Sequence, residues 1–305
     1  MSRYDVVIIG GGPAGLTAGL YTTRAGLKSL VLESMVFGGQ IINARLVENY
    51  PGFPDGITGF DLGELMYQQS VKCGLESENA EVTALKQGKP HVINTSEGDF
   101  EADIVIIAAG SKHRSLGVPG EEQLVGRGVS YCATCDGPMF RDKSVAVVGG
   151  GDTAITDALE LCQHASKVYV IHRRDELRGG KVLQDRAFSN PKIEFVWNSV
   201  VSEMVGDKFL DALRVRNVKT DQVSILEVEG VFIGVGTEPN SQCFGSVVEL
   251  DATGHIVVDD AMGTSVPGIF AAGDIRKNSG RQVSTAVGDG AMAGMSAFKY
   301  HLEQG

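Results

Sequence analysis

The part of the sequence most suited to redox chemistry is a pair of cysteines, Cys132 and Cys135, with two residues between them. This spacing is typical of a redox-active disulfide. The Asp136-Gly137-Pro138 segment that follows predicts a short helical turn, whose N-terminal N–H groups would favour a thiolate on the preceding cysteine. Asp136 can cap that turn and, if burial raises its pKa, can also donate the proton that a leaving thiolate needs. We therefore expect three catalytic residues: Cys132, Cys135 and Asp136.

Zinc is the main alternative for a Cys-x-x-Cys pair. A structural zinc site normally needs four ligands, and the sequence has no second Cys-x-x-Cys and no histidine pair at ligand spacing. We therefore expect no metal. The remaining cysteines, Cys73, Cys162 and Cys243, stand alone and are expected to be inert.

A glycine-rich loop near the start of the chain predicts the first nucleotide site. It lies between an apolar run, residues 4–9, and a small-residue segment with helical character. Such glycines allow a tight turn and let N–H groups at a helix N-terminus face a pyrophosphate. Glu33 ends the next predicted strand, where a carboxylate can accept hydrogen bonds from both hydroxyls of an adenosine ribose, so the site favours FAD or NAD. The alternative is a structural turn with a surface glutamate, which the complete β-α-β pattern disfavours. The expected binding residues are Gly10, Gly12, Pro13, Ala14, Gly15 and Glu33.

A second loop of the same kind follows the apolar run at residues 144–148, but the residue that corresponds to Glu33 has changed. That position holds His172, followed by Arg173 and Arg174, with Arg178 one helical turn further. Guanidinium groups bind a phosphate through bidentate hydrogen bonds, whereas a glutamate would repel one. The alternative, a solvated basic turn, is disfavoured by the position at the end of the second β-α-β strand. The second loop therefore predicts NADPH, bound by Gly149, Gly151, Asp152, Thr153, Ala154, His172, Arg173, Arg174 and Arg178.

These loops require two β-α-β units, and the rest of the chain supplies further strands. Strand-like runs that end in glycine turns lie at residues 104–110, 231–236 and 269–273. This alternation predicts an α/β fold with two Rossmann-like doubly wound dinucleotide-binding domains, the second inserted into the first. Segments rich in Gly, Pro and polar residues at 110–128 and 236–242 predict the links between them. We expect residues 1–113 and 243–305 to form the FAD-binding domain, and 114–242 the NADPH-binding domain with the cysteine pair.

The last part of the chain predicts a contact with the flavin ring. Gly273 and Asp274 end a strand-like run, and Arg281 and Gln282 precede a small-residue helical segment at 283–297. A helix N-terminus directed at the isoalloxazine would stabilise negative charge on the reduced ring. Helices rich in Gly and Ala often simply pack closely, so this prediction depends on the first domain needing a flavin.

Composition and charge narrow the function classes. The formal net charge of -11 disfavours nucleic acid as a partner, because phosphate-binding surfaces need clustered cations. No apolar run approaches the length of a membrane span, and residues 6–9 are too short for the core of a signal peptide. Five cysteines, an odd number and scattered apart from Cys132 and Cys135, do not form the framework of a secreted disulfide-rich protein. We therefore expect a cytoplasmic protein with no membrane partner.

The sequence resembles the small bacterial thioredoxin reductases, class II members of the pyridine nucleotide-disulfide oxidoreductase family, from Tyr4 to Leu302. The motifs that carry the resemblance are Gly10-Gly11-Gly12-Pro13-Ala14-Gly15, Gly38-Gly39-Gln40, Val47-Glu48-Asn49-Tyr50-Pro51-Gly52-Phe53, Cys132-Ala133-Thr134-Cys135-Asp136-Gly137, His172-Arg173-Arg174, Phe270-Ala271-Ala272-Gly273-Asp274 and Arg281-Gln282. Val283 and Ser284 depart modestly from the pattern, because many members carry Ala and a different small residue there.

The resemblance implies an NADPH-dependent thioredoxin-disulfide reductase that acts as a homodimer. Cys135 would face the flavin, Cys132 would attack the disulfide of thioredoxin, and Asp136 would be the acid. In this family the nucleotide domain rotates about its two links, since the pair cannot face the flavin and an outside protein at once. Beyond the first glycine loop and Glu33, the residues expected at FAD are Gly39, Gln40, Asn49, Gly273, Asp274, Arg281, Gln282 and Val283.

Four alternatives remain. A flavin-dependent dithiol oxidase would pass electrons to oxygen and would not need the arginine cluster. A ferredoxin-linked reductase would have lost nucleotide binding in the inserted domain, which the intact loop at residues 149–154 disfavours. A flavin-bound redox sensor would be reduced once by NADPH without turnover. A reductase of a peroxidase-type partner cannot be separated from a thioredoxin reductase by these residues.

Overall fold

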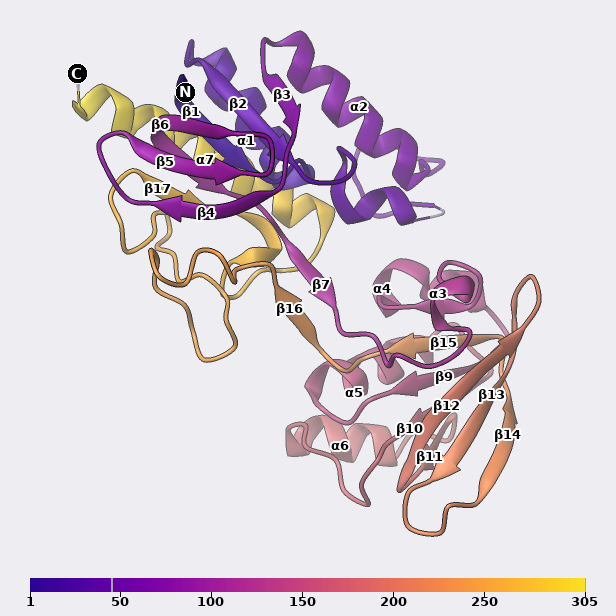
Figure 1. Ribbon diagram of the computed structural model, residues 1–305. Coiled ribbons are helices and arrows are strands. Elements are labelled where there is room, and N and C mark those ends of the chain that lie inside the picture. The colour runs from indigo at the N-terminus through magenta and orange to yellow at the C-terminus, as the bar shows by residue number, and fades with distance from the viewer. Residues whose placement is uncertain (45, 305) are drawn as a thin grey trace. The chain divides into compact units, whose positions relative to one another are not determined.

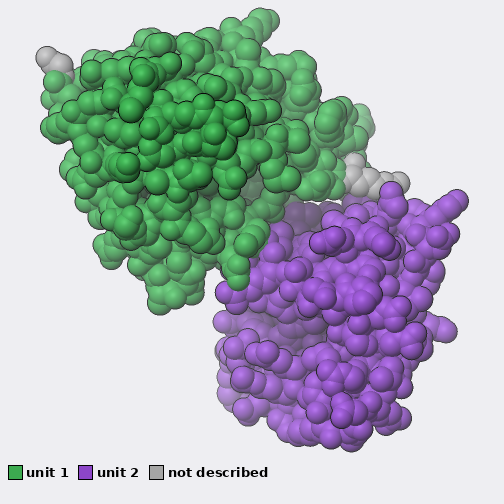
Figure 2. Space-filling model, viewed as in Figure 1, with its two compact units in different colours: residues 1–112, 238–305 green, residues 113–237 purple. Residues whose placement is uncertain are grey.

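The computed structural model describes residues 1–44 and 46–304. Residue 305, the last of the expected FAD-binding segment, lies outside the described residues. The chain forms two compact units, one made of residues 1–112 and 238–305 and the other of residues 113–237 (Figure 2). The second unit is thus inserted, in sequence, into the first. Both units are α/β, as predicted.

The first unit is built on a central sheet with helices (Figure 1). Its strands are β1 (Ser2–Ile9), β2 (Ser29–Glu33), β3 (Glu76–Asn79), β4 (Val82–Lys86), β5 (His91–Thr95), β6 (Asp99–Ile107) and β17 (Ile269–Ala271). The order is β3-β2-β1-β6-β5-β4, and β17 also pairs with β6. The pairs β1–β2, β2–β3, β1–β6 and β6–β17 are parallel, whereas β4–β5 and β5–β6 are antiparallel.

Successive side chains of β1 belong to two different apolar clusters, one on each face of the sheet. Val6 and Ile8 belong to one apolar cluster with Leu16, whereas Val7 and Ile9 belong to another with Phe244. Successive side chains of a strand point to opposite faces, so a continuous apolar run serves two cores at once. Because both faces are buried, apolar and polar residues do not alternate along this run.

Two helices of the first unit begin at residues that favour a first turn, and two helices pack closely through small residues. They are α1 (Pro13–Arg24), α2 (Gly59–Lys72), α7 (Val283–Gln304) and the 3₁₀ turns η1 (Gly39–Asn43) and η3 (Gly273–Ile275). Pro13 occupies the first turn of α1, where its missing N–H costs nothing. Thr58 caps α2 by accepting a hydrogen bond from the Asp61 N–H. A side chain at Gly290 of α7 would meet the backbone of Ala14, so the two helices pack closely.

The second unit has its own parallel sheet in the order β11-β10-β9-β15-β8. These strands are β8 (Val129–Ser130), β9 (Ser144–Val148), β10 (Lys167–Ile171), β11 (Ile193–Val196) and β15 (Gly230–Ile233). The helices are α3 (Glu121–Leu124), α4 (Ala133–Asp136), α5 (Asp152–Leu161), α6 (Lys181–Phe188) and the 3₁₀ turn η2 (Gly137–Phe140). Val145 and Val147 of β9 pack with α5, while Ala146 and Val148 pack against the other face.

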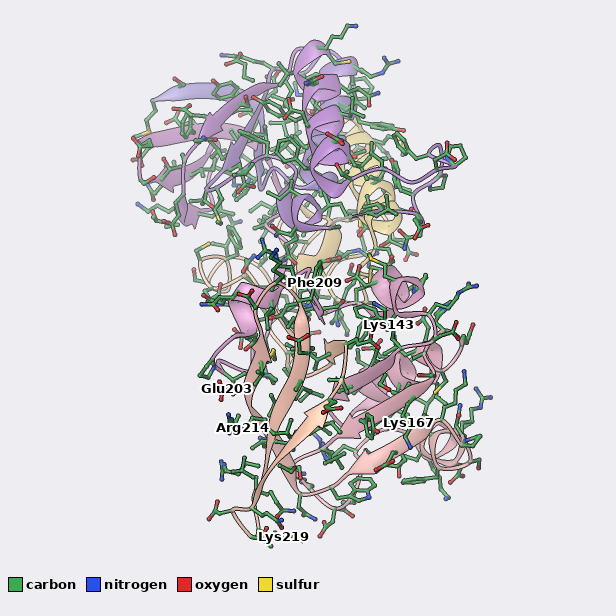
Figure 3. All side chains as sticks on the ribbon, turned by 90° about the vertical axis from the view of Figure 1, so that its right-hand side faces the viewer. Lys143, Lys167, Glu203, Phe209, Arg214 and Lys219 are labelled. Atoms are coloured by element: carbon green, nitrogen blue, oxygen red, sulfur yellow. A yellow bond between two sulfur atoms is a disulfide. The ribbon has the colours of Figure 1, made fainter. Side chains whose placement is uncertain are left out.

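An antiparallel three-stranded sheet covers that other face. It consists of β12 (Ser199–Gly206), β13 (Leu210–Asn217) and β14 (Val223–Glu227). Val201 and Leu213 contribute to the same apolar cluster as Ala146. On the exposed side, Arg214 forms an ion pair with Glu203 at 2.7 Å, and both are labelled in Figure 3.

Two short strands connect the units. These are β7 (Ser111–His113) and β16 (Thr237–Pro239), which pair with each other in a two-stranded sheet. Backbone hydrogen bonds flank the pair, from Arg114 N–H to Gly236 at 3.0 Å and from Asn240 N–H to Gly110 at 3.0 Å. Within residues 1–44 and 46–304, no helix has the length and apolar content that a membrane span requires.

Candidate active site

The two cysteines form a disulfide at the start of a short helix. Cys132 and Cys135 are bonded, with their Cα atoms 5.3 Å apart. Cys132 is the N-cap residue of α4, and its sulfur accepts a hydrogen bond from the Cys135 N–H at 3.1 Å. The helical turn predicted from Asp136-Gly137-Pro138 is η2, which starts at Gly137, and Asp136 precedes it without a side-chain capping bond. The helix α4 starts earlier, at the pair itself, and was not predicted. A backbone N–H directed at this sulfur favours the thiolate form of Cys132 once the disulfide is reduced.

Asp136 lies at the end of the same turn in a poorly solvated position. Burial raises its pKa, while a hydrogen bond from the Ser130 hydroxyl, 2.6 Å from Oδ2, opposes that rise. Ser130 is 5% exposed, and its Oγ also accepts a hydrogen bond from the Cys132 N–H at 3.1 Å. Sequence reasoning missed Ser130, although its place two residues before a Cys-x-x-Cys pair is a usable signal.

Helix α5 brings a further carboxyl group, that of Glu160, to α4 and carries a second one, Asp157, beside it. Thr134 donates a hydrogen bond to Glu160 at 2.9 Å. Asp157 lies one turn before Glu160, and burial together with the charge of Glu160 raises the pKa of Asp157 to about 6. No short-range pattern in the sequence marks Glu160, because its contact with Thr134 depends on how α5 packs against α4.

A buried carboxylate, Glu121, holds two backbone N–H groups and the side chain that directly precedes Cys132. Glu121 is 2% exposed and accepts hydrogen bonds from the N–H groups of Leu116 and Gly117 at 2.9 and 2.8 Å. The Tyr131 hydroxyl also donates to Glu121, at 2.9 Å, and the Tyr131 ring stacks on His113. Burial and this hydrogen bond raise the pKa of Tyr131, so it stays protonated. Sequence reasoning missed this group as well.

The first glycine loop has the shape that a pyrophosphate needs. Gly10 has a φ of 108°, and a Cβ there would lie 2.4 Å from the Ala108 oxygen. At Gly12, by contrast, a Cβ would meet only the Gly39 Cα, at 3.8 Å, so the loop is open at this point. Glu33 accepts hydrogen bonds from the N–H groups of Gly11 and Met35 at 2.8 and 2.9 Å. A carboxylate has about four acceptor sites, so Glu33 can hold the loop and still accept from ribose hydroxyls.

Two of the residues predicted at the flavin from distant parts of the chain, Gly39 and Gly273, lie against this loop and the start of α1. A Cβ on Gly39 would lie 2.9 Å from the Gly12 Cα, and one on Gly273 would lie 2.9 Å from the Ala14 Cβ. The Asn49 amide donates to the Gln282 side chain at 3.2 Å. Gln40 donates to the carbonyl of the distant Ser111. Asp274 and Arg281 are held by local bonds, since Asp274 accepts from Ser279 and the Arg281 N–H donates to Ser279. Val283 is the first residue of α7.

The second glycine loop is shaped by a buried histidine. A Cβ on Gly150 would lie 2.3 Å from the His172 ring, whereas one on Gly151 would meet nothing within 4 Å. His172 is 4% exposed, and its Nε2 has no hydrogen-bond partner among the described residues. Burial and the charges of Arg178, Arg174 and Arg173 lower the pKa of His172. The imidazole is therefore neutral at pH 7 and lies beneath the loop.

The three predicted arginines are exposed next to this loop. Arg178 is fixed to it by a backbone hydrogen bond to the Gly150 oxygen at 2.7 Å. In the described part of the chain, the side chains of Arg173, Arg174 and Arg178 have neither an ion pair nor a hydrogen bond. Asp152 is already engaged, since it accepts from the Gly180 N–H at 2.7 Å. The free guanidinium groups fit a phosphate next to an open glycine loop.

Comparison with known proteins identifies the family. The family model described as "Pyridine nucleotide-disulphide oxidoreductase" matches residues 4–290. A thioredoxin reductase of Listeria innocua is 47% identical over 299 residues, which is 97% of this chain and 93% of that protein. A crystal structure of thioredoxin reductase from Streptococcus pyogenes is 47% identical with a TM-score of 0.94, covering 100% of this chain and 99% of the other. A Lactococcus lactis thioredoxin reductase structure is 44% identical with a TM-score of 0.69, covering 98% and 99%. Together with the disulfide and the two glycine loops, these matches show that the chain belongs to the thioredoxin reductases of the pyridine nucleotide-disulphide oxidoreductase family.

Proposed function

We propose that this protein is a thioredoxin-disulfide reductase that takes electrons from NADPH through FAD to the Cys132–Cys135 disulfide. The observation that carries the proposal is the disulfide itself, formed at the start of α4 with the partly buried carboxyl of Asp136 at the end of the same turn. A disulfide with a thiolate-stabilising N–H and an adjacent acid can exchange with a second disulfide.

The two units supply one nucleotide site each. Enzymes of this family use FAD and NADPH. The open face at Gly12, with Glu33 and the neighbouring Gly39 and Gly273, fits the adenosine and pyrophosphate of FAD in the first unit. The open face at Gly151 and the free arginines fit the 2′-phosphate of NADPH in the second. When bound, FAD accepts a hydride from NADPH and supplies two electrons to the disulfide.

The residues of the chain then carry out disulfide exchange. The pair is opened to a Cys132 thiolate and a Cys135 thiol. The Cys132 thiolate attacks one sulfur of the thioredoxin disulfide, so a Cys132–thioredoxin bond forms and the thioredoxin S–S bond breaks. The leaving thiolate takes the proton of Asp136.

The second half of the exchange restores the enzyme. Cys135 gives its proton to the Asp136 carboxylate and attacks Cys132, which re-forms the Cys132–Cys135 bond. The second thioredoxin thiolate leaves and takes a proton from solvent. The thioredoxin disulfide has then gained two electrons and two protons, and Asp136 is ready for the next cycle.

Assembly, location and domain motion complete the proposal. We infer a cytoplasmic homodimer in which the unit of residues 113–237 turns about the β7 and β16 links. The paired links are short, three residues each, and so restrict the path of such a motion. A net charge of -11 disfavours a polyanionic partner, because like charges repel.

The cysteine pair is tested with single serine substitutions. Cys132→Ser and Cys135→Ser should keep FAD bound and keep NADPH able to reduce it, yet lose thioredoxin turnover by at least about a thousandfold, because neither variant can form the disulfide. Cys73→Ser, at an unpaired cysteine, should leave turnover unchanged. Turnover retained in both pair variants would refute the proposal.

A further inference from the structure

We propose that Ser130 is a positioning residue that holds the Asp136 carboxyl next to the redox disulfide and sets how readily Asp136 releases its proton. This inference rests on the proposed function, in which Asp136 is the acid. It assigns a second residue to proton delivery.

The Ser130 hydroxyl lies between the acid and the backbone of the attacking cysteine. Ser130 is the last residue of β8 and is 5% exposed. Its Oγ is 2.6 Å from Asp136 Oδ2, 3.1 Å from the Cys132 nitrogen and 3.4 Å from the Cys132 oxygen. The Asp136 N–H in turn donates to that same Cys132 oxygen at 3.1 Å. A single hydroxyl therefore contacts both the acid and the residue whose sulfur reacts.

This arrangement satisfies both protonation states of Asp136 without moving a heavy atom. A hydroxyl has one hydrogen and two acceptor lone pairs. With Asp136 ionised, the hydroxyl donates to Oδ2 and accepts from the Cys132 N–H. With Asp136 protonated, the carboxyl can donate to Oγ while the hydroxyl hydrogen turns to the Cys132 oxygen. The hydroxyl can therefore follow a change in the protonation of Asp136 by rotation alone, so the carboxyl keeps its place next to the disulfide in both states.

Few charged groups lie near this acid. Glu160 on α5 is bonded to Thr134, Asp157 lies one turn before it, and the His164 ring packs near Gly137. On the other side, Glu121 is bonded to Tyr131. The two causes of the shifted pKa of Asp136 are burial, which raises it, and the Ser130 hydroxyl, which lowers it. Without the hydroxyl, burial is unopposed, so the pKa of Asp136 should rise.

The test combines two readouts on the FAD-loaded enzyme. The first is the pH profile of kcat/KM for thioredoxin, whose alkaline limb is assigned to Asp136 by its loss in Asp136→Asn. The second is infrared difference spectroscopy of the oxidised protein, in which the carboxyl C=O band absent from Asp136→Asn is titrated directly. In Ser130→Ala both midpoints should move to higher pH by about one unit, the size expected for one hydrogen bond to a charged group. kcat should also fall, because the carboxyl loses its orientation.

Matched variants separate the hydroxyl from packing. Ser130→Thr keeps the hydroxyl and Ser130→Val replaces it with a methyl group in the same shape, so Thr should restore the original midpoints and Val should not. Ser241→Ala removes another buried serine hydroxyl, one that donates only to a backbone carbonyl in the first unit, and should move neither midpoint.

Each outcome decides between separate claims. Identical midpoints for the Thr and Val variants, or an unmoved infrared midpoint in Ser130→Ala, would overturn the role of Ser130. An unchanged alkaline limb in Asp136→Asn would instead reject Asp136 as the acid. Absence of thioredoxin reduction in the wild-type enzyme would reject the proposed function itself.

Discussion

At the residue scale, single charges distinguish the two glycine loops. Glu33 and His172 occupy equivalent places after their glycine loops, but one accepts hydrogen bonds and the other is a buried neutral ring next to three cations. A carboxylate suits ribose hydroxyls, whereas guanidinium groups suit a phosphate ester. In the proposed function, the choice of nucleotide therefore depends on a few side chains placed on similar backbones.

This difference predicts the effect of removing the arginines. Arg173→Ala with Arg174→Ala should raise the KM for NADPH by roughly 10- to 100-fold and leave the KM for NADH nearly unchanged, because a charge-assisted hydrogen bond contributes about 1.5–3 kcal/mol and only NADPH has the 2′-phosphate. Lys219→Ala is the control, since that cation is already bonded to Asp175 at 2.6 Å. Equal changes for both nucleotides would mean that the cluster is only a solvated turn.

The raised pKa of Asp157 predicts that the free energy of unfolding depends on pH. Its pKa in the folded protein is about 6, above the ordinary 3.8, so the folded state disfavours the charged form. The destabilisation is absent below pH 3.8, grows as the pH rises, and is complete above about pH 6. Asp157→Asn should therefore raise the free energy of unfolding by roughly 1–3 kcal/mol at neutral to alkaline pH and by less near pH 5.

Urea unfolding of Asp157→Asn and wild type at about pH 5 and about pH 8 measures this difference. Asp207→Asn, at an exposed carboxylate, should give no comparable gain. A gain that is equal at both pH values would show that the effect comes from packing and not from ionisation.

Local sequence identifies some site residues and not others. Cys132, Cys135 and Asp136 lie within five consecutive residues, so a redox pair with a neighbouring acid can be predicted from the sequence, whereas the separate roles of the two cysteines come from the family resemblance. Ser130 and Glu160 lie near the pair only because β8 joins the sheet and α5 packs against α4. The burial of His172 beneath Gly150 likewise follows from tertiary packing, which explains why the sequence groups it with exposed arginines.

At the scale of elements, two neighbouring glycines show which side of the second loop is packed and which is open. In the second loop, Gly150 and Gly151 are neighbours with opposite surroundings, since one faces the His172 ring and the other faces open space. Gly150→Ala should therefore lower the free energy of unfolding by about 1–3 kcal/mol, because its methyl group would overlap the ring. Gly151→Ala should leave stability nearly unchanged but raise the KM for NADPH at least about 10-fold, since the methyl group would fill the space proposed for the pyrophosphate.

Thermal unfolding and NADPH titration of both variants provide the check. The same loss of stability in both would contradict the open face at Gly151. Unimpaired NADPH binding by a folded Gly151→Ala protein would place the pyrophosphate elsewhere.

The contact between α1 and α7 predicts different effects of substitution at two glycines of α7. A Cβ on Gly290 would lie 2.1 Å from the Ala14 oxygen, whereas one on Gly288 would meet nothing within 4 Å. Gly290→Ala should lower the free energy of unfolding by roughly 1–3 kcal/mol. Gly288→Ala should be neutral or raise it by about 0.5–1 kcal/mol, the difference in helix propensity. Chemical denaturation measures both, and a stable Gly290→Ala would mean that the helices are further apart.

The sequence predicts elements well where apolar residues are continuous. The runs at residues 4–9 and 144–148 are β1 and β9, each followed by a glycine loop and a helix. The three-stranded sheet β12–β14 was not predicted. Its β14 is mostly exposed and carries polar residues, so its identity as a strand depends on pairing with β13.

At the scale of the whole molecule, one nucleotide-binding architecture is present twice and nested. Residues 113–237 form a compact unit between the two parts of the other unit. The internal repeat of glycine loops makes this doubling visible in the sequence, because each loop requires its own β-α-β unit. The rotation proposed for residues 113–237 involves the β7 and β16 links and bound ligands, and a local pattern of residues does not encode its extent.

The most direct test of the account is steady-state turnover of the purified yellow protein, with NADPH or NADH as donor and thioredoxin as acceptor. The account predicts rapid NADPH oxidation that requires thioredoxin, a much lower rate with NADH, and little oxidation with air alone. Failure of NADPH to bleach the flavin, while dithiols do bleach it, would contradict the account and favour a ferredoxin-linked reductase or a dithiol oxidase.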